Sequence, residues 1–325
     1  MAREDIVIVT PALADIKNGN WQTAHRWAAM LSSAYRVRLA EQWDGGNEGL
    51  MIALHARRSA SSAARWRAQR PAAPLAVVLT GTDLYRDIAT DAGAQASLQS
   101  ADRLIVLNQL GVQSLPAALR AKASIVLQSC SARPTLAKTG RHLRALMVGH
   151  LRGEKSPQTY FGAARLLAGR PDIRLDHIGA ALDADLGQEA AALTAGNPGY
   201  RWLGALPREA TRRRIQAAHL LVHPSRMEGG AHVVIEALRS GTPVLASRID
   251  GNVGLLGEGY AGYFPVGDAA ALASALQRLR DDPAMLAVLQ QQCALRAPLF
   301  DPALERATLH ALTAELMTPN LKAHP

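Results

Sequence analysis

Two glutamates, Glu228 and Glu236, are the residues of this sequence whose type and spacing best suit chemistry. Gly229 and Gly230 follow the first acid, and the second falls in a predicted helix over 231–239. A carboxylate accepts hydrogen bonds from two neighbouring hydroxyls, so it suits a ribose or a hexose. A helix start offers N–H groups and a positive dipole end to an anion, and glycines let a ligand approach the backbone closely. The pattern predicts a site for a nucleotide diphosphate sugar; a surface turn before an ordinary amphipathic helix is the alternative.

The flanking sequence predicts the elements that position these acids. Leu220 to His223 is a short apolar run typical of a buried strand, and the predicted helix ends at Gly241 before Thr242-Pro243. A second strand is predicted over 244–246. One acid therefore stands at a glycine turn between strand and helix, and the other stands within the helix.

This arrangement resembles the nucleotide-sugar site of the family 4 retaining glycosyltransferases of the GT-B fold. That family has a Glu-x7-Glu motif, usually with Gly between the acids and Gly-x-Pro-Val after the helix. The resemblance implies that Glu236 binds the ribose hydroxyls and that Glu228 lies beside the transferred sugar. It also implies that the backbone from Gly229 through Gly230 to Ala231 faces the diphosphate or the sugar.

Three further residues become donor-site candidates through the same resemblance. His223 and His232 flank the motif and are candidates for sugar contacts. Asn252 follows the strand after the helix, where the family places a loop near the sugar and phosphates.

Basic residues follow the predicted strand 145–148. The family places Arg directly after a Gly and Lys five positions later, to neutralise the donor diphosphate. Here His150 occupies the expected Arg position, Arg152 stands two residues further on, and Lys155 matches the Lys. A cation there would stabilise the charge that grows on the leaving group. A solvated loop is the alternative, but lysine is rare in this arginine-rich chain, which favours a role for Lys155.

A resident metal or cofactor is not expected, so the UDP-sugar enters only as a substrate. No Asp-x-Asp stands at the end of a predicted strand, where a divalent cation would bridge to a diphosphate. Asp183 and Asp185 have that spacing, but they lie in a polar, helix-forming segment that we interpret as surface.

The first half of the chain carries the acceptor candidates. Lys17, Asn18, Gly19 and Asn20 precede a predicted helix over 21–34 and form either an anion-binding loop or a plain turn. Thr82 and Asp83 follow the predicted strand 75–80. Asp83 would either cap a helix or orient the acceptor. His25 and His55 are more typical of structural histidines than of catalytic ones.

The order of predicted elements indicates an α/β protein with two parallel sheets, because strands and helices alternate on both sides of an irregular stretch over 131–142. The predicted domains are residues 1–135 and 142–300, with a final helix over 302–325 returning to the first. This is the GT-B architecture: two Rossmann-like domains facing across a cleft, with ligands at the carboxyl ends of the strands.

Composition narrows the function classes. The net charge is +9, but the basic residues are scattered, and the triplet 212–214 is interpreted as a solvated helix face, so no nucleic-acid partner is expected. No apolar run approaches the roughly 18 to 20 residues of a membrane span, so no stable membrane association is expected. Two distant cysteines and the absence of a signal peptide predict a reduced cytoplasmic location. The oligomeric state stays open.

Motifs over 18–24, 80–85 and 149–152 together resemble the selenosugar synthases of selenoneine biosynthesis. That resemblance implies a reaction between selenophosphate and UDP-N-acetylglucosamine or UDP-glucose, which yields a selenosugar, UDP and phosphate. The 17–20 loop would hold the phosphate of the acceptor, and the nucleophilic selenium would need no strong base. An ordinary transferase to a lipid, glycan or small alcohol is one rival. A non-catalytic nucleotide-sugar or nucleic-acid binding protein is the other.

Overall fold

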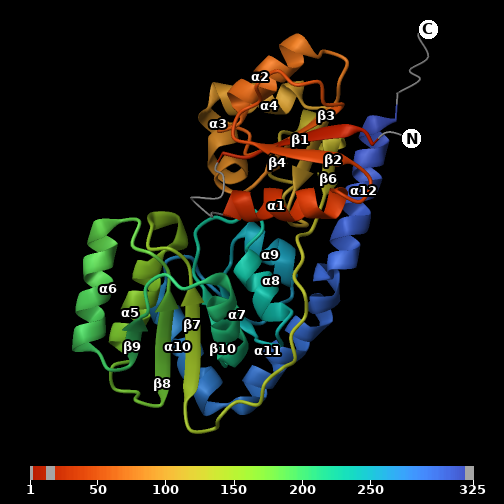
Figure 1. The fold of residues 1–325 in the computed structure, drawn as a ribbon. Coiled ribbons are helices and arrows are strands. Elements are labelled where there is room, and N and C mark those ends of the chain that lie inside the picture. Colours follow the sequence, from red (N-terminus) through yellow and green to blue (C-terminus); the bar gives the residue numbers. More distant parts are fainter. Residues whose placement is uncertain (1–2, 12–18, 319–325) are drawn as a thin grey trace. The chain divides into compact units, whose positions relative to one another are not determined.

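The computed structural model describes residues 3–11 and 19–318. The chain divides into two compact units (Figure 1). The first unit comprises residues up to Ser129 together with those from Pro302 onward, and the second runs from Cys130 to Asp301. Each unit is built on six parallel strands, as the alternation of predicted elements indicated.

The sheet of the first unit has the strand order β2-β1-β3-β4-β5-β6. Its strands are β1 (Asp5–Val9), β2 (Arg36–Ala40), β3 (Leu50–Leu54), β4 (Leu75–Leu79), β5 (Arg103–Val106) and β6 (Ala123–Ile125). Successive side chains of β1 enter different cores, with Ile6 and Ile8 in one cluster and Val7 and Val9 in the other. Because both faces are covered, the central strands are apolar throughout, which made them recognisable in the sequence.

Helices cover both faces of this sheet. They are α1 (Gly19–Leu31), α2 (Ala60–Gln69), the π-helix η1 (Asp83–Asp87), α3 (Ile88–Thr90), α4 (Ala92–Ser100), the 3₁₀ helix η2 (Ala117–Lys122) and α12 (Pro302–Met317). On one side Trp27 of α1 packs with Leu309 and Leu312 of α12, and on the other Trp66 of α2 meets Trp43 edge to face.

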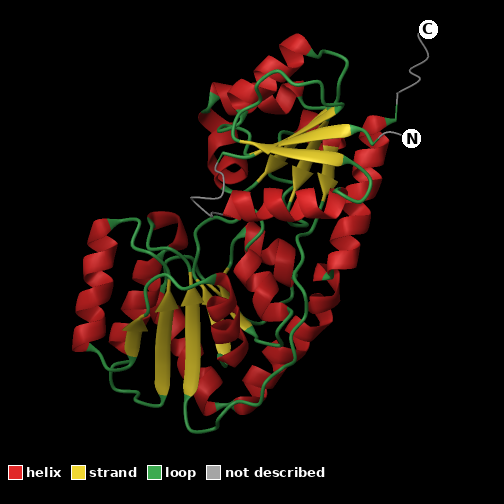
Figure 2. Ribbon diagram, viewed as in Figure 1, coloured by secondary structure: helices red, strands yellow, loops and turns green. Residues whose placement is uncertain are grey.

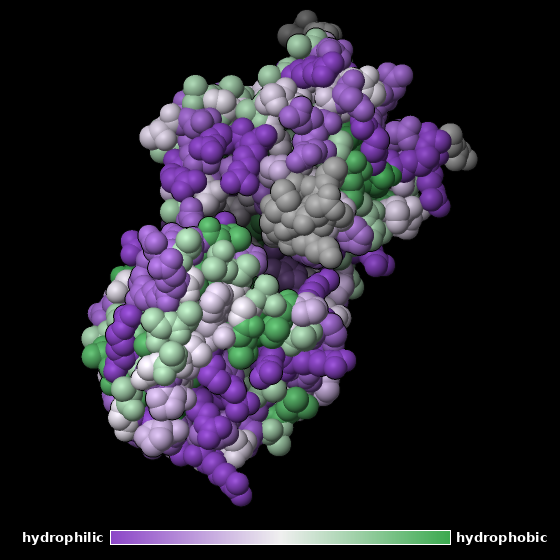
Figure 3. All heavy atoms as spheres, turned by 60° about the vertical axis from the view of Figure 1, so that its left-hand side comes forward, coloured by the Kyte–Doolittle hydropathy of each residue, from purple (hydrophilic) through white to green (hydrophobic). Residues whose placement is uncertain are grey.

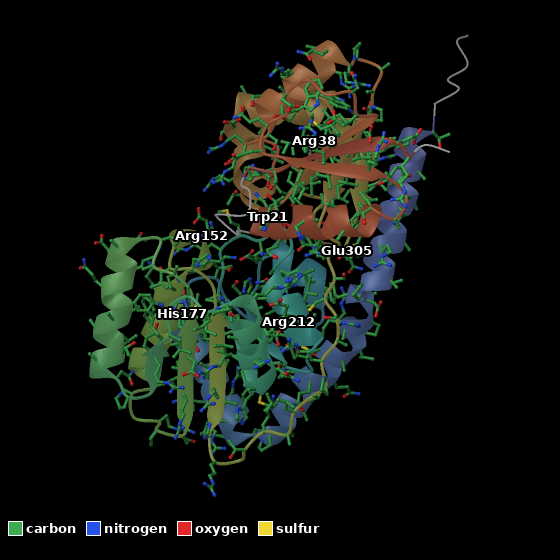
Figure 4. All side chains as sticks on the ribbon, viewed as in Figure 1. Trp21, Arg38, Arg152, His177, Arg212 and Glu305 are labelled. Carbon is green, nitrogen blue, oxygen red and sulfur yellow. The ribbon has the colours of Figure 1, made fainter. Side chains whose placement is uncertain are left out.

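A buried carboxylate fixes α12 in the first unit. Glu305 is almost inaccessible to solvent, and its Oε1 accepts a 2.7 Å hydrogen bond from the Trp27 indole. Arg26 Nε and Ser129 Oγ donate to its Oε2 at 3.1 and 2.5 Å. The helix that comes last in the chain is thus bonded to α1, near the chain's beginning (Figure 4).

The second unit has the strand order β12-β11-β10-β7-β8-β9. Helices surround these parallel strands, which Figure 2 draws in yellow. Its strands are β7 (Leu143–Val148), β8 (Ile173–Ile178), β9 (Tyr200–Trp202), β10 (Leu220–His223), β11 (Val244–Ser247) and β12 (Tyr263–Phe264). Its helices are η3 (Gly153–Lys155), α5 (Pro157–Leu166), α6 (Ala184–Gly196), α7 (Arg208–Ala217), α8 (His232–Leu238), α9 (Asp250–Leu256), α10 (Ala269–Asp281), α11 (Pro283–Arg296) and η4 (Ala297–Phe300). The Glu-x7-Glu stretch therefore forms the predicted strand, turn, helix and strand, as β10, α8 and β11.

Within the described residues, no helix is long and apolar enough to cross a membrane. The most exposed large apolar side chains, Leu295, Leu182 and Leu166, lie on different segments. On the face drawn in Figure 3, polar residues are interspersed among apolar ones.

Candidate active site

Glu228 and Lys155 form an ion pair at the carboxyl edge of the second sheet. Lys155 ends the turn η3 that follows β7, and Glu228 lies in the loop after the neighbouring strand β10. Lys155 Nζ lies 2.5 Å from Glu228 Oε1, and His223 Nε2 lies 3.2 Å from the same oxygen. Burial would raise the pKa of Glu228, but the charge of Lys155 and the contact with His223 outweigh it and lower the pKa overall. The pair therefore presents an ionised carboxylate and an ammonium group together.

The loop that carries Glu228 is held from behind by the start of α9. A side chain at Gly251 would place its Cβ 1.9 Å from the carbonyl oxygen of Glu228, so only glycine permits this approach. Asn252 is fully buried and donates through Nδ2 to the carbonyl of Ser247 at 2.9 Å. Its Oδ1 has no hydrogen-bond partner within the described part of the chain. Asn252 thus shapes the loop, and its contact with a donor stays a prediction.

Glu236 lies in α8 with a single carboxylate oxygen turned toward nitrogen atoms. Its Oε1 lies 3.4 Å from His232 Nδ1 and 3.8 Å from the Nε atoms of Arg208 and Arg212. Burial would raise the pKa of Glu236, but these contacts, led by the hydrogen bond from His232, lower it overall. The acid predicted to bind ribose is therefore nearly buried and ionised, which is the state that accepts two hydroxyl hydrogen bonds.

The glycine pair lies where the sequence placed it, immediately before α8. Ala231 occupies the N-cap of that helix and is buried, and no side chain caps the helix. Gly229 and Gly230 connect it to Glu228. Contacts from this backbone to a diphosphate or a sugar stay a prediction.

The loop after β7 is positioned by a buried histidine that sequence reasoning did not single out. His177 of β8 donates through Nε2 to the carbonyl of Gly149 at 3.1 Å, while its Nδ1 pairs with the Tyr200 hydroxyl at 3.1 Å. Burial lowers the pKa of His177 to about 4, so the ring is neutral. Gly179 approaches the same carbonyl so closely that its Cβ would lie 1.9 Å away. The only advance signal was a histidine near the end of a predicted strand, next to Asp176.

His150 and Arg152 follow on this loop. His150 Nδ1 accepts a hydrogen bond from the Ala180 amide at 3.1 Å, and burial, with the nearby charges of Arg152 and Lys155, lowers its pKa. A neutral imidazole therefore occupies the position where the family has Arg. Arg152 is exposed at the end of the sheet toward which the strands point (Figure 4).

Ser156, next to Lys155, has a left-handed backbone with φ of 49°. This conformation costs a non-glycine residue about 1–2 kcal/mol. It turns the chain sharply between η3 and α5, and Pro157 begins the helix. Strain of this kind is commonly retained where it places a functional side chain, here the adjacent Lys155.

In the first unit, Asp83 is engaged with the backbone. It is fully buried, and its carboxylate accepts hydrogen bonds from the amides of Ala56, Thr80 and Gly81, each at 2.9 Å. This geometry gives Asp83 a structural role, although not the expected helix cap, because Thr82 is the N-cap of η1. Contact of Asp83 with an acceptor stays a prediction. Thr82, which is only partly buried, has its hydroxyl 3.1 Å from His55 Nε2.

A second strained residue marks the same edge. His55 follows β3 with φ of 73° and is buried, and burial lowers its pKa against the opposing charge of Asp83. Asp87 ends the π-helix η1, a form often found at functional sites, and its buried Oδ2 has no hydrogen-bond partner among the described residues. That oxygen lies 3.6 Å from Arg57 Nε and 3.9 Å from His55 Nε2. Sequence reasoning ranked His55 low and did not consider Asp87.

The predicted anion loop before α1 is only partly described. Lys17 and Asn18 lie outside the described residues, whereas Gly19 and Asn20 begin α1. Thr23 Oγ1 donates to the carbonyl of Gly19 at 2.9 Å. The acceptor role of this loop stays a prediction.

Two other sequence interpretations, of Asp183 with Asp185 and of residues 212–214, concern residues that lie on helices. Asp183 caps α6 by accepting from the amides of Asp185 and Leu186, so this pair is a helix start, as expected. Residues 3–11 and 19–318 contain no group of three or more His, Cys, Asp or Glu that could hold a metal ion. The solvated-face interpretation of 212–214 is wrong for Arg212: its position in α7 turns it inward with Thr211 and Ile215, whereas Arg213 and Arg214 are exposed.

Comparison with known families identifies the class of this protein. The model of the family "Glycosyl transferases group 1" matches residues 131–295, and the chain belongs to that family. The GT-B fold predicted from the sequence is confirmed by solved structures. Sucrose-phosphate synthase from Thermosynechococcus elongatus superimposes with a TM-score of 0.76 at 18% identity, covering 97% of this chain and 99% of that one. The Anabaena protein HepE, solved in complex with UDP, gives 0.75 at 14% identity, covering 97% and 100%.

Curated relatives are similar over shorter segments. The D-inositol 3-phosphate glycosyltransferase of Streptomyces avermitilis is 30% identical over 205 residues, which make up 60% of this chain and 43% of that protein. The GDP-mannose-dependent alpha-mannosyltransferase of Corynebacterium glutamicum is 33% identical over 115 residues, 35% of this chain and 25% of its own length. The matched segments thus span less than half the length of either relative.

Proposed function

We propose that this chain transfers a hexose from a UDP-sugar whose nucleotide and sugar bind at the carboxyl edge of the second sheet. The Lys155–Glu228 ion pair is the observation that carries the proposal. It joins a cation to an ionised acid from two neighbouring strand ends, where parallel α/β sheets bind their ligands. Support for the donor class comes from family membership and from structural similarity to HepE, which was solved with UDP-glucose.

Each donor residue then has a distinct role in the proposed transfer. Glu236 accepts hydrogen bonds from the ribose hydroxyls. Lys155, with the exposed Arg152, offsets the negative charge that grows on UDP as the anomeric C–O bond breaks. Glu228 holds Lys155 through their ion pair and faces the sugar hydroxyls when the donor is bound. The reaction so described uses no metal.

The acceptor that we propose is selenophosphate, supplied through the first unit. A selenium lone pair forms the bond to the anomeric carbon as UDP leaves with the electron pair of the broken C–O bond. Water then cleaves the P–Se bond, which gives the selenosugar and phosphate. Selenium needs no deprotonation before attack. A general base is therefore unnecessary. This agrees with Asp83, whose carboxylate already accepts hydrogen bonds from three backbone amides.

A transferase to an oxygen acceptor is the second candidate, favoured by one observation. Asp87 Oδ2 is buried without a hydrogen-bond partner in the described chain, beside His55 and Arg57. A carboxylate with a vacant acceptor position suits a hydroxyl that must be oriented or deprotonated, whereas the selenium of selenophosphate needs neither. The Asp87→Asn variant therefore discriminates between the candidates: it should impair use of a hydroxyl acceptor and leave selenophosphate use intact.

The deciding experiment measures UDP release from UDP-N-acetylglucosamine and UDP-glucose, with and without selenophosphate, and identifies the product by mass. Selenium in the sugar product together with selenophosphate-dependent release supports the selenosugar reaction and ranks the donors. UDP binding without selenophosphate dependence rejects it and calls for a screen of hydroxyl acceptors. The Glu228→Gln variant controls for UDP released by spontaneous hydrolysis.

A further inference from the structure

Arg212 is a nearly buried arginine beside the acid proposed to bind ribose. It lies on α7, with 9% of its surface exposed (Figure 4). Its Nη2 donates to Cys130 Sγ at 2.9 Å and to the Ser131 carbonyl at 2.8 Å, and its Nη1 donates to Ser131 Oγ at 3.3 Å. Both terminal nitrogens are thus attached to the segment that begins the second unit.

These attachments set the direction of the remaining nitrogen. A guanidinium group is planar, so fixing both Nη atoms also fixes the plane in which Nε–H points. Arg212 Nε lies 3.8 Å from Glu236 Oε1, and it is buried without a hydrogen-bond partner among the described residues. Arg208 lies at the same distance from that oxygen, but 59% of its side chain is exposed, so solvent screens its charge more.

Glu236 needs a neighbouring cation because burial opposes its charge. A carboxylate removed from water becomes protonated unless charges or hydrogen bonds favour the ionised form. A protonated carboxyl group loses part of its capacity to accept, so it would bind a pair of hydroxyls poorly. The contacts at Oε1 keep the group ionised.

We propose that Arg212 is a positioning residue for the nucleotide ribose: anchored on Cys130 and Ser131, it holds Glu236 ionised and oriented toward the ribose hydroxyls. This inference rests on the proposed function, in which Glu236 binds the ribose. Cys130 is the neutral part of the anchor, because burial raises the pKa of its thiol against the opposing charge of Arg212. The buried cysteine thereby contributes to nucleotide recognition without touching the nucleotide.

The test measures binding of UDP and of 2′,3′-dideoxy-UDP by calorimetry, since their ratio isolates the ribose hydroxyls. Hydrogen bonds to charged groups predict that wild type prefers UDP by about tenfold or more. Arg212→Gln should lower that preference by about threefold or more while changing dideoxy-UDP affinity by less than about threefold. Arg212→Lys, which keeps the charge but loses the fork, should show an intermediate ratio. Arg213→Gln is the matched control, since the next residue of α7 is exposed and should leave the ratio unchanged.

The pH dependence of UDP affinity supplies a readout that a purely structural role would not move. Besides Arg212, Glu236 faces His232 of its own helix and Arg208 of α7. Removing one of these charges raises the pKa of Glu236, so the affinity of Arg212→Gln should begin to fall at a higher pH on acidification than that of wild type. Cys130→Ala, a smaller change, should shift the ratio in the same direction.

The outcomes separate this inference from the donor-site proposal. If Glu236→Gln leaves the UDP preference intact, the proposed ribose site is wrong. If Glu236→Gln abolishes the preference but Arg212→Gln and Arg212→Lys retain it, only the role of Arg212 is overturned. Should Arg212→Gln fail to fold, Arg212→Lys and Cys130→Ala decide the matter, and an unchanged ratio in both rejects the proposal.

Discussion

The carboxyl edges of the two sheets hold buried acids that are satisfied in different ways. In the second unit, Glu228 and Glu236 are balanced by cationic and imidazole side chains. In the first unit, the carboxylate of Asp83 is occupied by three backbone amides. Side chains can turn toward an arriving ligand, whereas backbone amides of a packed loop cannot. The acids of the second edge can therefore exchange their side-chain partners for a ligand, whereas Asp83 stabilises the backbone of the first edge.

Both edges nevertheless contain a strained residue after a strand: His55 directly follows β3, and Ser156 lies between η3 and α5. Ser156 and His55 are the only non-glycine residues with positive φ in the described ranges. Ser156 adjoins Lys155, and His55 contacts Thr82. In each unit, strained backbone thus lies beside a candidate site residue, Lys155 in one and Thr82 in the other. The two edges share this feature even though their buried carboxylates are satisfied differently.

The largest expected effect comes from separating the charged pair of the second edge. Lys155→Met should lower kcat for UDP release by about 10²–10³-fold, the loss typical of removing one group that stabilises transition-state charge. Because Lys155 and Glu228 are in contact, adding Glu228→Gln should cost less than the sum of the two single changes. Glu258→Gln, at an exposed acid of the same unit, is the control. Activity of Lys155→Met within threefold of wild type would contradict the proposed role.

The second largest effect is expected from removing Asp83, the buried acid of the first edge. Asp83→Ala leaves three backbone amides without their acceptor and should lower the free energy of unfolding by about 3 kcal/mol or more, measured by urea denaturation. UDP affinity should stay unchanged, because the proposed donor residues lie in the second unit. Glu41→Ala, at an exposed position, is the control. Unaltered stability with impaired acceptor use would reverse the comparison and make Asp83 a ligand-binding residue.

A smaller effect concerns pH and the support of the donor loop. Burial depresses the pKa of His177 to about 4, so the unfolded chain binds the proton more readily than the folded one. The stability that this neutral ring contributes is present above pH 6.5 and is lost as the pH falls toward 4, by up to about 3 kcal/mol. His177→Gln should flatten that part of the pH profile of unfolding, while His25→Gln, at an exposed position, should not. An equally steep profile in both variants would remove His177 as the cause.

Much of the architecture could be predicted from the sequence because both sheets are parallel and covered on both faces. Apolar runs such as 75–79 and 220–223 are recognisable without tertiary context, and the Glu-x7-Glu spacing located the turn and helix that carry the two acids. What could not be predicted depended on which way a polar residue points. Arg212 was predicted to be solvated because it belongs to a triplet whose other two arginines are exposed. The structural role of His177 was missed because its partners, Gly149 and Tyr200, are remote in sequence.

The first edge was harder to predict for a related reason. The sequence leaves the role of Asp83 open. Only the positions of three amides, which come from two separate loops, indicate that its role is structural. Asp87 gave no signal at all, because a π-helix has no simple sequence pattern. Local propensity identifies elements, but it does not reveal how a carboxylate is shared among distant backbone groups.

The bonding of α12 to the first unit has a consequence for the order of events during synthesis. The second unit, from Cys130 to Asp301, is contiguous and its synthesis is complete before Pro302 is added. Until then, Trp27 lacks its Glu305 partner and the apolar cluster beneath α1 lacks Leu309 and Leu312. The N-terminal sheet therefore keeps uncovered apolar surface until α12 is available. Chaperone binding or aggregation of the nascent chain would be concentrated in that interval.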